Sequence, residues 1–302
     1  PRSDSSAASD VYKRQVRKLR RRLTFKNIES EISEIENGLY VSMNQDSVKV
    51  ELSLNDLKLR LKNIRKILIN EHQSLFLDQL DDLILKVEIF GYHFATLDIR
   101  QDSRIHSYVF NKIIKKIKPA EFNNYSRSNY IEKSKFLSSL HGNFKPSFFS
   151  DELVSSTLGS IRAMQKIQKS NGESGCHRYI ISNNQTAINI LEVFTMFKIS
   201  GWKKNTFDII PLFETISDLD IAVEIMEKIY SNDAYREHLS YRNNEQTIML
   251  GFSDGTKDGG YLTANWKILT AKEKLTRISR KHKIKVKFFD GRGGPPARGG
   301  GN

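Results

Sequence analysis

FDIIPLFETISDLDIAVEIMEKIY, residues 207–230, carries the pattern that decides the fold. Residues 207–213 form a short apolar run, mostly β-branched or aromatic, which is typical of a buried strand. Residues 217–230 then have the apolar spacing of a helix. A strand followed directly by a helix is one βα unit, and such units build parallel sheets and barrels.

Four more apolar runs of strand length occur along the chain. They are residues 94–99 (FATLDI), 178–182 (RYIIS), 247–252 (TIMLGF) and 284–289 (IKVKFF). From residue 178 onwards these runs alternate with single helices at intervals of about 30–40 residues, the spacing of βα units. The expected fold class is therefore α/β, with a parallel sheet or barrel in a mostly helical protein.

Further helices are expected outside these units. Residues 52–70 place Leu57, Leu61, Ile64 and Leu68 on one stripe, which is typical of an amphipathic helix. The other expected helices are 16–40, 74–90, 103–118, 130–140, 151–170, 185–198 and 261–282. Residues 1–15 are small, polar and unpatterned, and we interpret them as a non-native or disordered leader.

Charge and composition allow one function class besides catalysis. The chain has 302 residues and a formal net charge of +13, with eight bases and no acid between Lys13 and Lys26. Such a basic arm favours nucleic-acid binding, whereas a solvated helix face is the plainer interpretation. No run approaches the ~18 apolar residues of a membrane-spanning helix. Cys176 is the single cysteine, which excludes an internal disulfide and favours a reducing compartment.

Polar residues stand at or just after the expected strand ends. Arg100, Asn183-Asn184, Glu214 and Asp254 follow the first four, and the fifth leads to Asp290 and Arg292. In parallel α/β folds the loops after strand ends build the site.

Two of these residues are carboxylates. Glu214 and Asp254 suit a hard divalent ion such as Mg²⁺, although a pair of ordinary loop acids is the alternative. Arg100, Arg292, Arg298 and Lys257 would add positive charge at the same edge, as a phosphorylated acid requires.

The glycine-rich end GRGGPPARGGGN, residues 291–302, has two interpretations. Glycines let backbone amides approach an anion closely, as in an active-site loop. The alternative is a disordered RNA-binding tail of the RGG type. The strand expected immediately before it, together with Pro295-Pro296, favours the active-site loop.

Four motifs together resemble one known family, phosphoenolpyruvate carboxylase. They are FGYHFATLDIRQDS (90–103), PLFETISDL (211–219), GFSDGTKDGG (251–260) and FDGRGGPPARGG (289–300). The resemblance covers residues 16–302. It implies a largely helical protein around a (β/α)₈ TIM-type barrel, of which about five strands are present, as a cytoplasmic homotetramer when complete. The expected organisation is a leader (1–15), a helical segment (16–90) and a partial barrel ending in a glycine-rich active-site loop (91–302).

The resemblance also implies an activity. Phosphoenolpyruvate and bicarbonate would give oxaloacetate, which feeds the tricarboxylic acid cycle, and phosphate. The reaction would run through carboxyphosphate and an enolate, with Mg²⁺ or Mn²⁺. By motif position, Glu214 and Asp254 resemble the metal ligands and Arg100 a substrate-phosphate contact. Arg292 resembles the principal catalytic arginine, Arg298 the glycine-loop arginine and Lys257 an active-site lysine near bicarbonate.

The chain departs from the family pattern in three ways. Asp290 stands where the family usually has histidine, so its role is open. The family's N-terminal catalytic histidine has no counterpart here, and the chain ends just past the glycine loop. We therefore expect an internal fragment, about a third of the usual length, that is inactive alone.

Overall fold

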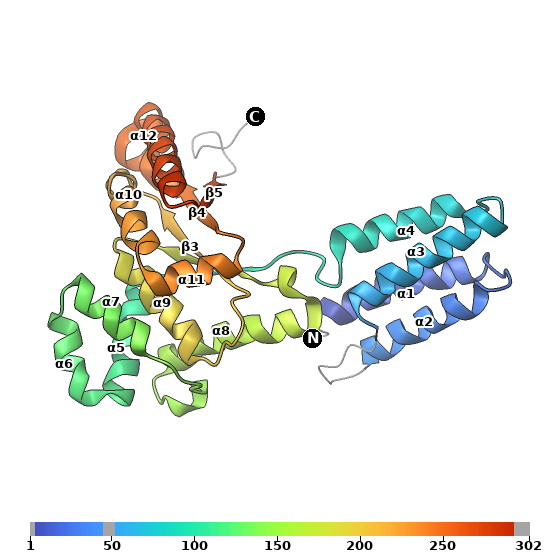
Figure 1. Cartoon of the computed structure of the whole chain (residues 1–302), viewed down its shortest axis with the longest axis horizontal. Coiled ribbons are helices and arrows are strands. Elements are labelled where there is room, and N and C mark those ends of the chain that lie inside the picture. Colours follow the sequence, from blue (N-terminus) through green and yellow to red (C-terminus); the bar gives the residue numbers. More distant parts are fainter. Residues whose placement is uncertain (1–3, 45–51, 293–302) are drawn as a thin grey trace. The chain divides into compact units, whose positions relative to one another are not determined.

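The computed structural model describes residues 4–44 and 52–292, which fall into two compact units. The first comprises residues 1–97 and 164–176, and the second comprises residues 98–163 and 177–302. None of the described helices is long and apolar enough to cross a membrane. Figure 1 shows the chain coloured along its sequence.

The first unit is built from four helices. They are α1 (Asp4–Arg20), α2 (Glu29–Asn44), α3 (Leu54–Glu71) and α4 (Leu77–Phe90). The stripe expected on residues 52–70 is confirmed, since Leu57, Leu61, Ile64 and Leu68 are buried on α3. These side chains belong to one apolar core shared by the four helices.

The beginning of the chain differs from the sequence-based expectation. Residues 4–15 are helical instead of disordered, and the side chains of Ala8 and Tyr12 are buried in the core of the first unit. The Tyr12 hydroxyl donates a hydrogen bond of 2.6 Å to the carbonyl of Gly91. Similarly, the single helix expected over residues 16–40 is interrupted after Arg20, and Asn27 in the interruption has a left-handed φ of 69°.

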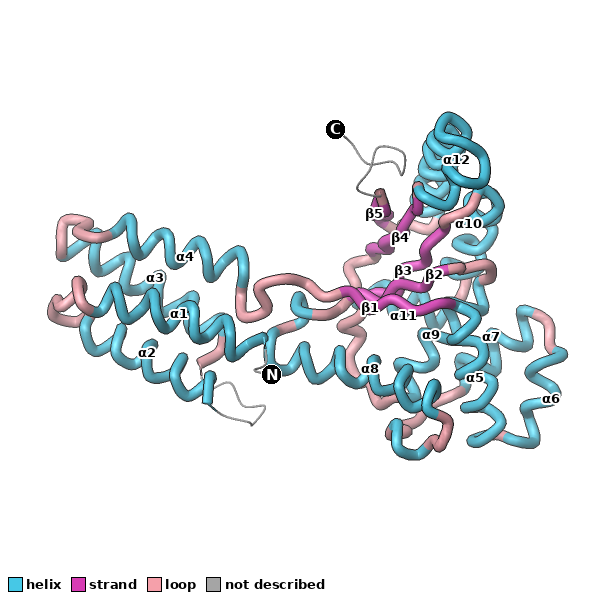
Figure 2. Tube along the Cα trace, turned by 180° about the vertical axis from the view of Figure 1, so that it is seen from behind, coloured by secondary structure: helices cyan, strands magenta, loops and turns pink. Residues whose placement is uncertain are grey.

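The second unit contains a parallel sheet of five strands in the order β1-β2-β3-β4-β5. The strands appear side by side in Figure 2. They are β1 (Asp98–Asp102), β2 (Arg178–Ser182), β3 (Asp208–Phe213), β4 (Glu245–Gly251) and β5 (Lys285–Gly291). The expected α/β class is therefore confirmed. A sheet whose spatial order follows the chain order has the arrangement found in (β/α) barrels, whereas doubly wound sheets reverse direction at a switch point.

Helices that follow successive strands pack against one another in chain order, α5 on α9, α9 on α10 and α10 on α12. The helices that begin in this unit are α5 (Ser103–Ile117), α6 (Pro119–Arg127), α7 (Tyr130–Ser139), α8 (Glu152–Asn171), α9 (Ala187–Ile199), α10 (Ile216–Tyr230), α11 (Asp233–Tyr241) and α12 (Ser253–Lys281). Residues 164–171 of α8 belong to the first unit. The sequence-based prediction missed α6 and α11, and it began α12 at residue 261, after the kink at Gly260.

The two faces of the sheet carry different side chains. Tyr179 of β2 points to the helices, since its hydroxyl bonds His106 of α5 at 2.9 Å and its ring packs on Phe197 of α9. Alternate residues therefore lie on the opposite face. There an apolar cluster is formed by Ile180, Ile210 and Leu212, with Met249 and Phe289 against it.

The first strand is displaced from its predicted position. The run at residues 94–99 was expected to form it, but β1 spans Asp98–Asp102. Phe94 instead has a left-handed φ of 57°, and its ring stacks on Tyr12 of the first unit. The aromatic ring of Phe94 thus packs with the helices of the first unit instead of in the sheet. As a result, Arg100 lies inside the first strand instead of after it.

Candidate active site

Arg100 and Glu214 form an ion pair at the sheet. Arg100 lies on β1 and Glu214 immediately follows β3, yet Arg100 Nη2 is 2.9 Å from Glu214 Oε1. The pairing register aligns Arg100 with Ile180 and Ile180 with Ile210. Glu214 lies four residues beyond Ile210, so both side chains belong to the face opposite the helices. The Arg100 side chain is about half exposed, which leaves it open to an external anion.

Glu214 also contacts the start of the GFSDG motif. A Cβ added at Gly251, the last residue of β4, would lie 2.9 Å from Glu214 Cγ. A Cβ at Gly255 would lie 3.3 Å from the Glu214 carbonyl oxygen. The motif needs glycine at these positions because the end of β4 and the start of α12 pack closely on Glu214.

Asp254 and Lys257 pair within the first turns of α12. Lys257 Nζ is 2.9 Å from Asp254 Oδ1, and both side chains are largely exposed. The three-residue spacing on a helix accounts for this contact. The acidic residue in the first turn also lies at the positive end of the helix dipole. Both expected site residues are thus accessible, and each partly neutralises the other.

Arg292 lies against an aromatic ring that sequence reasoning did not single out. Its guanidinium carbon is 4.6 Å from the ring centroid of Phe252, a cation–π distance. The Phe252 ring is buried, and its backbone N–H donates to the Gly291 carbonyl at 3.4 Å. Phe252 therefore connects the end of β4 to Arg292. The sequence feature that could have identified Phe252 is its position inside the GFSDG motif.

Asp290 is directed away from this site. It lies within β5, whereas the sequence suggested a loop position, and the carboxylate accepts an ion pair from Lys272 of α12 at 2.7 Å. Its neighbour Phe289 packs on the opposite face with Ile180 and Leu212. The carboxylate of Asp290 thus links β5 to α12. Arg298 lies outside the described residues.

These contacts link the predicted site residues in one continuous series. Arg100 pairs with Glu214, Glu214 packs on Gly251, and the adjacent Phe252 supports Arg292. Asp254 lies in the first turn of the helix that follows Phe252. Four of the five strands contribute, Arg100 from the middle of β1 and the other residues from the carboxyl ends of β3, β4 and β5 or just beyond them. Among the described residues, no group of three or more His, Cys, Asp or Glu side chains gathers at a potential metal position.

Comparison with known proteins identifies the family of this chain. The family model described as phosphoenolpyruvate carboxylase matches residues 2–302. The chain belongs to the phosphoenolpyruvate carboxylase family. The resemblance seen in the four motifs is therefore confirmed.

Three curated relatives from bacteria carry the name phosphoenolpyruvate carboxylase. The chain is 36% identical to that of Nitrosomonas europaea over 82% of its own length and 27% of the relative. It is 35% identical to that of Nitrosomonas eutropha, with the same two shares. It is 33% identical to that of Gloeobacter violaceus, over 74% of the chain and 24% of the relative. The chain thus spans about a quarter of the length of the relatives it matches.

The donor set fits the metal that membership of this family implies. Glu214 and Asp254 supply only carboxylate oxygens, the ligands that Mg²⁺ and Mn²⁺ prefer. Their side chains are 22% and 48% exposed, so water or substrate oxygens can reach them. Each carboxylate has one cationic partner, Arg100 or Lys257, which holds the negative charge in a defined position. A metal ion that keeps several waters is compatible with two protein carboxylates.

Proposed function

We propose that this chain provides the metal- and phosphate-binding part of a phosphoenolpyruvate carboxylase. The contact between Arg100 and Glu214 carries the proposal, because it brings a phosphate-binding type of side chain to a metal-binding type of side chain. Family membership supports the same activity, and the carboxylases it resembles are about three times as long as this chain. The longer polypeptide proposed to contain this chain would close the five strands into an eight-stranded barrel, and its cytoplasmic location and tetrameric state are part of the proposal.

Arg100 and Arg292 bind the phosphoryl group of phosphoenolpyruvate in this proposal. Guanidinium groups donate paired hydrogen bonds to phosphate oxygens, and both side chains approach the site from separate strands. Glu214 holds Arg100 and the buried ring of Phe252 holds Arg292. Both cations are thereby oriented before substrate arrives, which reduces the entropy lost on binding. Arg298 would add a further cation from the glycine-rich segment.

Glu214 and Asp254 would hold the Mg²⁺ or Mn²⁺ ion. When bound, such an ion stabilises negative charge on an oxygen of the substrate as a Lewis acid. The protein's own task is to place two carboxylates so that the substrate and the phosphate-binding arginines meet there. Lys257, paired with Asp254, would lie where the small anion bicarbonate can be attracted.

The proposed reaction transfers a phosphoryl group and then a carboxyl group. A bicarbonate oxygen attacks phosphorus, the bond from phosphorus to the enol oxygen breaks, and carboxyphosphate and an enolate result. Carboxyphosphate releases CO₂ and phosphate, and the methylene carbon of the enolate bonds to CO₂ to give oxaloacetate. Arginines that neutralise the phosphoryl oxygens lower the barrier to the first step. A glycine-rich segment that closes over the site would protect carboxyphosphate from water.

The nucleic-acid alternative lacks comparable support. Arg17 Nε and Arg20 Nη1 each lie 2.9 Å from the carboxylate of Glu36, so two cations of the basic arm are already paired. Lys13 lies over the ring of Tyr40 at 4.0 Å. These contacts agree with a basic helix packed in its unit, and nothing in the comparisons favours nucleic acid. Most of the RGG-type segment lies outside the described residues.

An assay of oxaloacetate formation tests the proposal. In the longer polypeptide, oxaloacetate should form only when phosphoenolpyruvate, bicarbonate and Mg²⁺ or Mn²⁺ are all present. Glu214→Gln removes the charge that would hold both the metal and Arg100 and should abolish the reaction. Glu224→Gln, which changes an exposed carboxylate on α10 paired with Lys228, is the matched control. Activity in Glu214→Gln equal to that of the control would reject the assignment.

A further inference from the structure

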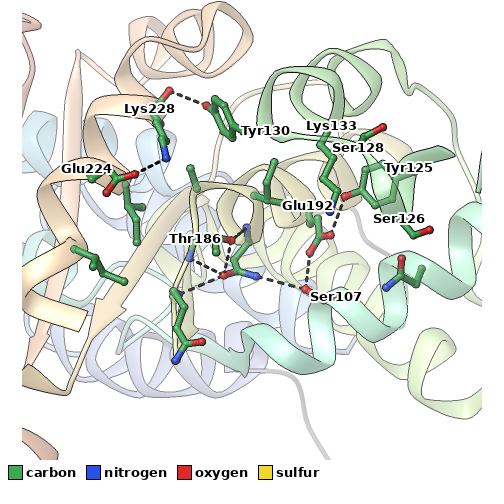
Figure 3. Close-up of a pocket in the computed structure, with 17 residues that line it drawn as sticks. Ser107, Tyr125, Ser126, Ser128, Tyr130, Lys133, Thr186, Glu192, Glu224 and Lys228 are labelled. Atoms are coloured by element: carbon green, nitrogen blue, oxygen red, sulfur yellow. Dashed lines mark hydrogen bonds and ion pairs between the residues drawn. The ribbon is translucent and has the colours of Figure 1, made fainter. Parts of the chain in front are cut away.

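A cavity of about 530 Å³ lies among helices of the second unit, and Figure 3 shows its lining. Polar side chains of α5 to α7 line it, together with both polar and apolar side chains of α9 and α10. The lining includes Ser107, Tyr125, Lys133, Glu192, Ile221 and Ile225. None of the candidate active-site residues lines this cavity. Its volume lies in the range of small-molecule sites, about 300–1,000 Å³.

Glu192 of α9 presents a buried carboxylate to this cavity. Its side chain is only 4% exposed. Ser107 Oγ donates to Glu192 Oε2 at 2.8 Å, and the Tyr125 hydroxyl donates to Oε1 at 2.8 Å. An ionised carboxylate offers about four acceptor positions, so about two remain for a ligand. Both donors are neutral hydroxyl groups, which leaves the negative charge itself without a direct counterpart.

No cation of the described chain forms an ion pair with Glu192. The charge of Lys133 acts on Glu192, and its ammonium lies 5.3 Å from the centre of the Tyr125 ring. Burial raises the pKa of Glu192, while the two hydroxyl bonds and the charge of Lys133 oppose the shift. A carboxylate buried without an ion-pair partner is costly, and a cation entering the cavity would remove that cost.

We propose that this cavity binds a small organic molecule bearing a protonated primary amine, whose ammonium group donates to Glu192. An ammonium group has three donors and matches the free acceptor positions of the carboxylate. Ile221 and Ile225 of α10 provide apolar surface for a short hydrocarbon stem. An anionic ligand would be repelled by the carboxylate of Glu192. A metal ion lacks further ligands, since no cluster of three metal-binding side chains occurs in the described residues.

Three ligands that share one stem test the charge requirement on the unaltered chain. Propylammonium, propanol and propanoate are titrated separately into the longer polypeptide at millimolar concentrations, and binding is followed by calorimetry and by the NMR signals of the ligands. Saturable binding of propylammonium alone is expected. Equal binding of propanol, or no saturable binding of propylammonium, would overturn the proposal. This comparison needs no substituted protein.

Two substitutions then locate the ammonium group. Glu192→Gln keeps the size of the side chain and removes its charge, and it should weaken propylammonium at least about tenfold, or about 1.4 kcal/mol. Glu224→Gln changes another carboxylate of the same cavity, one already paired with Lys228 at 2.6 Å, and should bind as the unaltered chain does. Undiminished affinity in a folded Glu192→Gln protein would refute the role of Glu192.

The pH dependence provides an independent measurement. Besides Glu192, the charged and titratable groups facing the cavity are Lys133, Glu224, Lys228, Tyr125 and Tyr130, and no histidine is among the residues that line it. The Lys228 side chain lowers the pKa of Glu224, and burial raises the pKa of both tyrosines. Because its pKa is raised while that of Glu224 is lowered, Glu192 is the carboxyl group of this lining expected to take up a proton first as pH falls. Affinity for propylammonium should rise with pH, and a flat profile would contradict the proposal.

Discussion

Arg100 Nη2 lies 2.9 Å from Glu214 Oε1, although the two residues are 114 positions apart in the sequence. β2 lies between the strands that carry or precede them. The contact joins the proposed phosphate-binding cation to a proposed metal ligand. A substitution of either residue should therefore weaken the binding of both the metal ion and the substrate phosphate. Two independent sites would instead respond separately.

Glu214→Gln in the longer polypeptide should lower both metal affinity and turnover. We expect kcat to fall at least about 100-fold, equivalent to about 2.7 kcal/mol of transition-state stabilisation. Mn²⁺ affinity, measured by electron paramagnetic resonance, should fall at least about tenfold because a carboxylate ligand is lost. If Mn²⁺ affinity is unchanged in a folded variant, Glu214 is not a metal ligand.

Phe252 should act through Arg292. Cation–π contacts contribute about 0.5–2 kcal/mol, so Phe252→Leu in the longer polypeptide should reduce kcat/KM by about two- to thirtyfold. Phe252→Tyr retains an aromatic face and should restore most of the activity.

A double-mutant cycle separates this role from simple packing. In an Arg292→Lys background, which alters the guanidinium, Phe252→Leu should cost less than it does alone. Thermal unfolding measures the packing loss separately. Equal losses of kcat/KM in both backgrounds would show that Phe252 does not act through Arg292.

Much of the sheet was predictable because its strands are buried and continuous in sequence. The predicted limits of β2 agree with the structure at both ends, and β3 differs by a single residue. β1 was misplaced because Phe94 is apolar for a different reason: its ring packs on Tyr12 in the first unit. An apolar run in the sequence predicts that its side chains are buried, but it does not show against which part of the protein they pack.

The sequence predicted which residues belong to the candidate site, but it did not predict which of them contact one another. Motif positions identified Glu214 and Arg100, but a contact across 114 residues depends on strand register, which the sequence does not specify. The orientation of Asp290 also depended on where β5 ends. Because the strand continues to Gly291, alternation turns Asp290 toward Lys272.

Buried histidines should make the second unit sensitive to acid. Burial lowers the pKa of His106 and of His238 to about 4 in each case. The unfolded value is about 6.5, so below that pH the unfolded chain takes up protons that the folded chain does not. The stability contributed by the neutral imidazoles is complete above about pH 6.5 and is lost as pH falls toward 4, by up to about 1.4 kcal/mol per pH unit for each histidine.

Denaturant unfolding between pH 7 and pH 5 measures this dependence. His106→Gln should reduce the slope of unfolding free energy against pH, whatever it does to the stability at pH 7. His141→Gln, at an exposed position, is the control and should leave the slope unchanged. An unchanged slope in His106→Gln would contradict the assignment of a neutral buried imidazole.

The 302-residue chain alone should not turn over phosphoenolpyruvate. In the described residues β1 and β5 are the outer strands of the sheet, and each pairs on one side only. Unpaired strand edges favour association with other chains, so we also expect aggregation. Light scattering and an oxaloacetate assay on the purified chain test both points, and steady turnover by a monodisperse preparation would contradict them.

The most direct measurement is the carboxylation rate of Arg292→Ala in the longer polypeptide, beside Arg277→Ala on the exposed side of α12 as a control. Both proteins are first compared by circular dichroism. If Arg292 neutralises the transferring phosphoryl group, oxaloacetate formation should be abolished in Arg292→Ala while the fold and the control rate are retained. A rate for Arg292→Ala equal to that of the control would contradict the account.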